Sequence, residues 1–140
     1  MDYFKKFKGR FTGIMQWDDC HNLLQILHDN PNDWYVYDTL ESMPTQVANA
    51  QDFSSQITLI KSIIDTEHEE KYCGIVYTDD LKQPTFVKIF HPKNLGKTCG
   101  GSENPPMPQW LISKEKPMDV VAEFGPKEES EGLISKYLKF

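Results

Sequence analysis

Apolar residues recur every three or four positions in two stretches of the chain, which is the spacing of an amphipathic helix. The first stretch covers 20–27 and stops before Asn30-Pro31, because the residue before a proline avoids the α region. The second stretch covers 53–64. The positions that carry the two patterns are Cys20, Leu23, Leu24 and Leu27, then Phe53, Ile57, Ile60 and Ile64. A C-terminal helix is predicted over 127–140, where an acidic start and a lysine-bearing end suit the helix dipole.

Shorter segments that are rich in β-branched and aromatic residues predict strands. These segments are 9–15, 34–37, 72–77, 84–91 and 110–113. The third and fourth are joined by a short turn and predict a β-hairpin. The order of elements predicts a small single α+β domain over 1–140, with a mostly antiparallel sheet and about three helices packed mainly on one face. A mixed sheet is the alternative, because the early strand–helix–strand order allows a parallel crossover.

Composition narrows the class of protein. A chain of 140 residues, 39% hydrophobic and 12% aromatic, can bury a core of its own. The formal net charge of −6 disfavours general nucleic-acid binding, which depends on accumulated Lys and Arg. Apolar runs are far shorter than the ~20 residues needed to cross a bilayer, and no secretory signal is visible. The 3 cysteines do not suggest a disulfide framework, so we expect a cytoplasmic protein with no membrane span.

The N-terminus is the exception to this acidic composition. Between positions 4 and 11, phenylalanines are interleaved with lysines and an arginine, which is compatible with contact to an acidic partner or a membrane surface. We favour an edge strand or a fraying terminus whose lysines face the solvent, because charge runs are usually solvated.

The segment 91–110 is the most informative part of the chain. It resembles one long loop between two strands, and loops of this length are usually functional or mobile. The proline-rich arm 104–110 should be extended and pre-ordered at low entropic cost. Met107 and Trp110 are the expected anchors for a partner, because methionine is common at adaptable surfaces and tryptophan in interface hot spots. The alternative is that this arm only packs Trp110 onto the sheet and leads to the next strand.

A thiol or metal site is the second hypothesis. Cys73 and His91 lie on neighbouring arms of the predicted hairpin, and Cys99 follows on a Gly-Gly turn. These three side chains are the candidate metal ligands, although the close cysteine pair of a zinc site is missing. Lys93 and Lys97 would favour a thiolate at Cys99, with His91 as its base. Alternatively, Cys73 is a small buried core residue, as free cysteine commonly is.

No complete catalytic constellation can be assembled from these residues, so we expect an accessory or regulatory protein rather than an enzyme, with no cofactor unless the metal site forms. It would bind another protein through the end of the hairpin and the 91–110 segment. The expected binding residues are His91, Lys93, Asn94, Lys97, Cys99, Met107 and Trp110. A homodimer that buries the aromatic strand 34–37 is compatible with either hypothesis.

Overall fold

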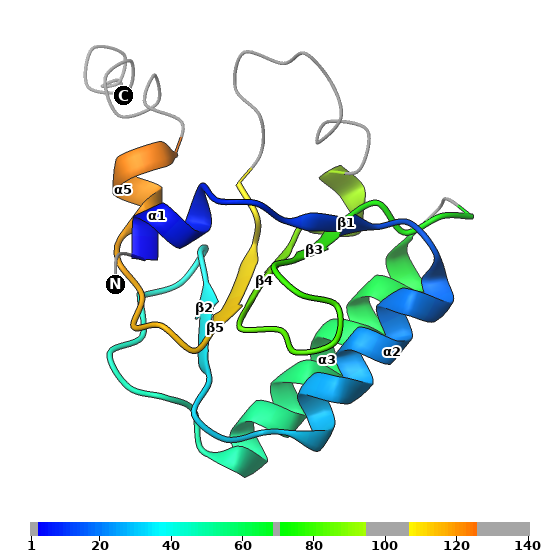
Figure 1. Cartoon of the computed structure of the whole chain (residues 1–140), viewed down its shortest axis with the longest axis horizontal. Helices are drawn as coiled ribbons and strands as arrows, with labels where there is room; N and C mark the ends of the chain where they lie inside the picture. Colours follow the sequence, from blue (N-terminus) through cyan, green and yellow to red (C-terminus); the bar gives the residue numbers. More distant parts are fainter. Residues whose placement is uncertain (1–2, 69–70, 95–106, 126–140) are drawn as a thin grey trace.

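The computed structural model describes residues 3–68, 71–94 and 107–125. They contain a five-stranded sheet with the strand order β1-β3-β4-β5-β2 (Figure 1). The strands are β1 (Thr12–Ile14), β2 (Tyr35–Asp38), β3 (Val76–Thr78), β4 (Phe86–Ile89) and β5 (Trp110–Ser113). The predicted α+β class is confirmed. The mixed-sheet alternative is wrong, because every pairing in this sheet is antiparallel.

Two long helices cover one face of the sheet. α2 (Trp17–Asp29) and α3 (Ala50–Glu67) pack side by side across it (Figure 1). Their buried residues include every position of the two predicted apolar patterns. α3 begins after the N-cap Asn49, whose side chain accepts a hydrogen bond from the Asp52 N–H at 2.8 Å. The helix predicted over 127–140 lies outside the described residues.

Two short helices cover the opposite face, so the described ranges hold four α-helices rather than about three. α1 (Tyr3–Phe7) and α5 (Val120–Phe124) are neighbours, and the rings of Phe7 and Phe124 stack with centroids 5.4 Å apart (Figure 1). The expected edge strand or fraying N-terminus is wrong, because Tyr3 and Phe7 are buried against the sheet and hold a helix there. Within the described ranges, no helix is long and apolar enough to cross a membrane.

Alternation along the strands divides the core into two layers. On β4, Val87 and Ile89 belong to the layer under α2 and α3, whereas Phe86 belongs to the layer under α1 and α5. Both faces of the sheet are therefore buried, which explains why the central strands are nearly continuous apolar runs. The register pairs Ile89 with Trp110, so His91 lies at the Trp110 end of the sheet.

Candidate functional site

His91 follows β4 and contacts three elements. Its Nε2 lies 3.6 Å from Oε1 of Glu67 at the end of α3, and its ring stacks with that of Trp110, with centroids 6.3 Å apart. Its Nδ1 accepts a hydrogen bond from the Lys93 backbone N–H at 3.2 Å, within the short 3-10 helix η1 (Pro92–Asn94). Because Nδ1 is an acceptor, the neutral ring carries its proton on Nε2, on the side of Glu67. His91 therefore joins β4 to α3 and β5.

Trp110 is a core residue that also forms part of a surface cavity. Its side chain is 6% exposed and belongs to the layer under α2 and α3. Trp110 thus packs in the core, as the alternative interpretation of the arm requires, whereas its role as an anchor for a partner stays a prediction. Trp110 also lines a cavity of about 270 Å³ between α3 and β2, which we call the α3–β2 groove. The residues that line the α3–β2 groove are Val36, Asp38, Glu41, Ser42, Gln56, Leu59, Ile60 and Trp110.

One large apolar side chain of the lining is exposed: Leu59 of α3 is 60% accessible. Leu40 and Met43, the sequence neighbours of the lining residues Glu41 and Ser42, are 76% and 36% exposed. The charged residues in the lining are Asp38 and Glu41, both carboxylates. The lining of the groove thus combines apolar side chains with two carboxylates. Such a surface suits an apolar side chain that is flanked by Lys or Arg.

Hydrogen bonds attach the end of the 91–110 segment to one wall of the α3–β2 groove. Thr39 donates its backbone N–H to the Gln109 carbonyl at 2.7 Å and its hydroxyl to the Pro108 carbonyl at 2.8 Å. Asp38 accepts from the Gln109 side-chain amide at 3.4 Å and from the Leu40 N–H at 2.9 Å. Pro108 and Gln109 therefore lead into β5 as a fixed extension of the sheet.

The structure places the two predicted anchors, Trp110 and Met107, on opposite faces of the sheet. His91 and Trp110 come together at one end of the sheet. Lys93 is exposed on η1, and Asn94 ends that 3-10 helix. Met107 is half-buried and packs against the core layer under α1 and α5, on the other face of the sheet from the groove.

Cys73 lies in the core. It is 1% exposed and its sulfhydryl is hydrogen-bonded to that of Cys20 on α2, which is 0% exposed. This hydrogen bond lowers the pKa of Cys73 and, together with burial, raises the pKa of Cys20. The alternative of a buried core Cys73 is confirmed. Lys97 and Cys99 lie outside the described residues, so the set of Cys99, His91 and Cys73 stays a prediction. Over the ranges that are described, no group of three or more His, Cys, Asp or Glu residues is arranged to hold a metal ion.

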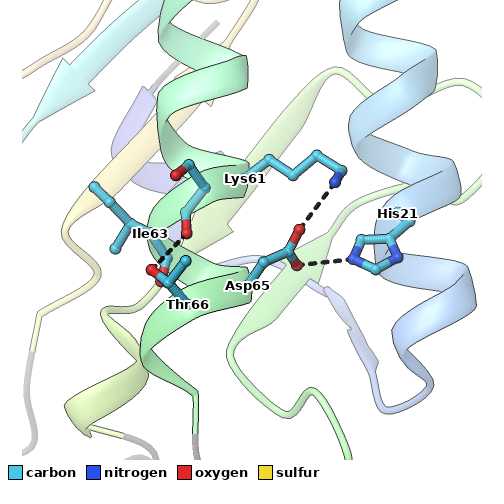
Figure 2. Close-up of polar contacts among 6 residues, drawn as sticks. His21, Lys61, Ile63, Asp65 and Thr66 are labelled. Atoms are coloured by element: carbon cyan, nitrogen blue, oxygen red, sulfur yellow. Dashed lines mark hydrogen bonds and ion pairs between the residues drawn. The ribbon is translucent and has the colours of Figure 1, made fainter.

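A histidine–carboxylate–lysine chain, which the sequence analysis missed, links the two long helices (Figure 2). Asp65 of α3 accepts hydrogen bonds from Nε2 of His21 on α2 and from Nζ of Lys61, each at 2.9 Å. Burial alone would raise the pKa of Asp65, but the hydrogen bonds from Lys61 and His21 hold it below its ordinary value. The four-residue spacing of Lys61 and Asp65 is a recognisable helical ion pair, whereas His21 is too distant in sequence to be found from spacing.

These hydrogen bonds tie α2 to α3. The side chains of His21 and Asp65 are 41% and 33% exposed. Among the described residues, no hydroxyl or thiol is hydrogen-bonded to His21, so the nucleophile of a triad is not in place. Nearby, the ring of Trp17 packs against that of His68 with centroids 4.2 Å apart, which joins the start of α2 to the end of α3.

Comparison with known proteins gives no family. No protein-family model matches the chain, and no curated protein or solved structure matches it either. The assignment of function therefore rests on the groove, the contacts of His91 and the distribution of charge.

Proposed function

We propose that this protein binds another protein through the α3–β2 groove and the adjoining turn at His91–Asn94, and acts as an accessory or regulatory factor in the cytoplasm. The exposure of Leu59 in the lining of a cavity carries this proposal, and Leu40 and Met43 are exposed in the same segment as the lining residues Glu41 and Ser42. Apolar side chains exposed at a cavity with polar neighbours are typical of interaction sites, since a partner that covers them removes apolar surface from water. The cytoplasmic placement rests on sparse cysteines, of which Cys20 and Cys73 are free thiols.

The charges at the groove indicate the chemistry of the partner. Asp38 and Glu41 line the cavity, and Glu67 lies beside the adjoining turn. A partner segment with one large apolar side chain flanked by Lys or Arg would bury the first in the groove and place its cations near these carboxylates. Complementary charge mainly accelerates association and selects the partner, whereas the buried side chain supplies most of the affinity.

The groove needs little reorganisation to bind. Its β2 wall is held by the hydrogen bonds between Thr39 and the 108–109 segment, and its other wall is the long helix α3. A preformed surface avoids the cost of ordering loops on association. This supports recognition by a fixed surface, with the partner supplying the flexible segment.

Leu59→Glu is the variant that tests the groove. Affinity purification with the intact protein should recover a specific partner, and Leu59→Glu should weaken its capture about tenfold, the loss expected when a central apolar contact is replaced by a charge. A photoreactive amino acid in place of Leu40 should cross-link to the same partner. Leu59 is exposed, so its substitution should leave the fold intact.

Leu81→Glu is the matched control, because Leu81 is an exposed leucine, 46% accessible, in the β3–β4 turn at the other end of the sheet. It introduces the same charge change away from the groove. Equal capture of one partner by Leu59→Glu, Leu81→Glu and the parent protein would overturn the proposal. Deleting 104–108 tests separately whether the prolyl arm contributes to binding.

Native mass spectrometry separates this function from the thiol or metal hypothesis. The protein is purified without chelator, and its native and denatured masses are compared. A bound ion that is lost on denaturation would favour a site on Cys99, His91 and Cys73 over partner binding. The same spectrum gives the subunit count and so tests the homodimer.

A further inference from the structure

A second cavity, of about 340 Å³, lies at the opposite end of the sheet from His91. We call it the hairpin-turn pocket. It is lined by Ile26, Asn30, Trp34, Lys82, Gln83, Pro84, Thr85 and Lys114. These residues come from the end of α2, the entry to β2, the β3–β4 turn and the exit of β5, so four separate pieces of the chain converge on one space. A cavity of this volume is in the range that holds a small organic ligand.

The charge of the hairpin-turn pocket is opposite to that of the chain. The protein has a formal net charge of −6, yet both charged residues in the lining are lysines, Lys82 and Lys114. A third ammonium group is close, because Lys6 Nζ donates a hydrogen bond to the lining hydroxyl of Thr85 at 3.1 Å. Within the described ranges, none of these three lysines forms an ion pair with a carboxylate.

Two aspartates of the β3–β4 turn lie close to the pocket and are occupied by the turn itself. Asp79 accepts the backbone N–H groups of Thr85 and Phe86 at 2.9 and 3.0 Å, and also the Thr85 hydroxyl. Asp80 accepts the backbone N–H groups of Lys82 and Gln83 at 2.8 and 3.0 Å. These bonds fix the turn that presents Lys82. The backbone N–H groups of Gln83 and Lys82, together with the nearby Lys82 ammonium group, hold the pKa of Asp80 below its ordinary value.

Lys114 is held in position over one wall of the pocket. Its Nζ donates to the Asn32 carbonyl at 2.7 Å and lies 4.2 Å from the centre of the Trp34 ring. Trp34 is fixed in turn, because its indole N–H donates to the Asn30 carbonyl at 2.7 Å and its ring stacks on Phe53. An ammonium group has three N–H donors, so Lys114 keeps donors for a ligand after its bond to the carbonyl.

We infer that the hairpin-turn pocket binds a small organic phosphate monoester, with the phosphate between Lys82 and Lys114. The apolar part of the ligand would lie against Ile26 and Pro84. The Gln83 amide offers further hydrogen bonds, and so does the second N–H of the Asn30 amide, whose first N–H donates to the Ile26 carbonyl at 2.8 Å. A phosphate monoester carries close to two negative charges at neutral pH, which matches several ammonium groups better than a single carboxylate does. This site lies at the other end of β4 from the α3–β2 groove and does not depend on the proposed partner.

Calorimetric titration with phenyl phosphate tests the inference on the intact protein. Phenyl phosphate should bind more tightly than inorganic phosphate, which lacks the apolar part, and more tightly than benzoate, which carries one charge. Lys82→Gln and Lys114→Gln should each weaken binding about tenfold, as expected for the loss of one charge-assisted contact. Raising the salt concentration should weaken binding further.

Lys71→Gln is the matched control, because Lys71 is exposed and lies outside the pocket lining, and its substitution changes the net charge equally. It should leave the affinity for phenyl phosphate unchanged. Lys82 and Lys114 are both exposed, so unchanged thermal unfolding of their variants would show that folding is intact. Equal weakening in all three variants, absence of binding at millimolar probe, or equal affinity for benzoate would each overturn the inference.

Discussion

Lys88 provides the sharpest test of the physical reasoning about this fold. It lies on β4 on the face covered by α1, and its Nζ is 4.5 Å from the ring centre of Phe7 and 4.1 Å from that of Phe11. No carboxylate pairs with it among the described residues. Loss of hydration on burial lowers the pKa of Lys88 from 10.5 to about 8.

Because the pKa of Lys88 is lower in the folded protein than in the unfolded chain, the free energy of unfolding depends on pH. Between pH 8 and 10.5 the unfolded chain holds more protons at Lys88 than the folded one, so stability rises with pH in this window. Below pH 8 Lys88 is protonated in both the folded and the unfolded protein, so the full cost of burying its ammonium group lowers the stability. A fall from 10.5 to about 8 corresponds to about 3.4 kcal/mol at about 1.4 kcal/mol per pKa unit. Attraction of the ammonium to two rings, worth about 0.5–2 kcal/mol, and partial solvent exposure reduce this to about 1–2 kcal/mol.

We therefore expect Lys88→Met to be about 1–2 kcal/mol more stable than the parent protein at pH 7, with an advantage that shrinks as pH approaches 10. The free energy of unfolding is measured by urea denaturation at several pH values from 7 to 10. Burial raises the pKa of Tyr3 and of Tyr37, so ionisation of unfolded tyrosines lowers stability at high pH. That contribution is common to both proteins and cancels in their difference.

Lys5→Met is the control, because it removes the same charge from an exposed position on α1. Its difference from the parent protein should not change with pH in this window. If the difference in free energy of unfolding between Lys88→Met and the parent protein were also independent of pH, the reasoning would be refuted. It would show that the two aromatic rings compensate fully for the lost hydration.

Three further predictions follow from burial, capping and thiol contacts. Phe53→Ala should lower the free energy of unfolding by about 3–5 kcal/mol in urea denaturation, because its ring is fully buried in the core; a loss below about 1 kcal/mol would contradict this packing. Asn49→Ala should cost about 0.5–2 kcal/mol through the lost N-cap of α3, whereas Asn22→Ala, at an exposed position of α2, should cost far less. In a Cys99→Ser background, the two core cysteines should react with a thiol reagent far more slowly in native than in unfolded protein; equal rates would show that they are accessible.

The candidate site was only partly predictable, because its parts come from distant segments. The local composition of 91–110 pointed to His91 and Trp110, and the structure does bring these two rings together. The α3–β2 groove was missed, since it needs α3, β2 and the turn after β2 in one place. The exposure of Leu59 could not be predicted from its neighbours in sequence. It is an apolar residue within the helix α3, but it lies outside the stripe of residues that α3 buries.

Local sequence determined the two long helices, the approximate positions of the five strands and the α+β class, because each depends on a periodicity of a few residues. Only the tertiary structure decided that β2 pairs with β5 and that the N-terminal phenylalanines form a helix on the far face of the sheet. It also decided where the lysines at the hairpin-turn pocket and the carboxylates at the α3–β2 groove gather. Pairing across the sheet and the meeting of charges depend on contacts between residues far apart in sequence, which a local pattern does not contain.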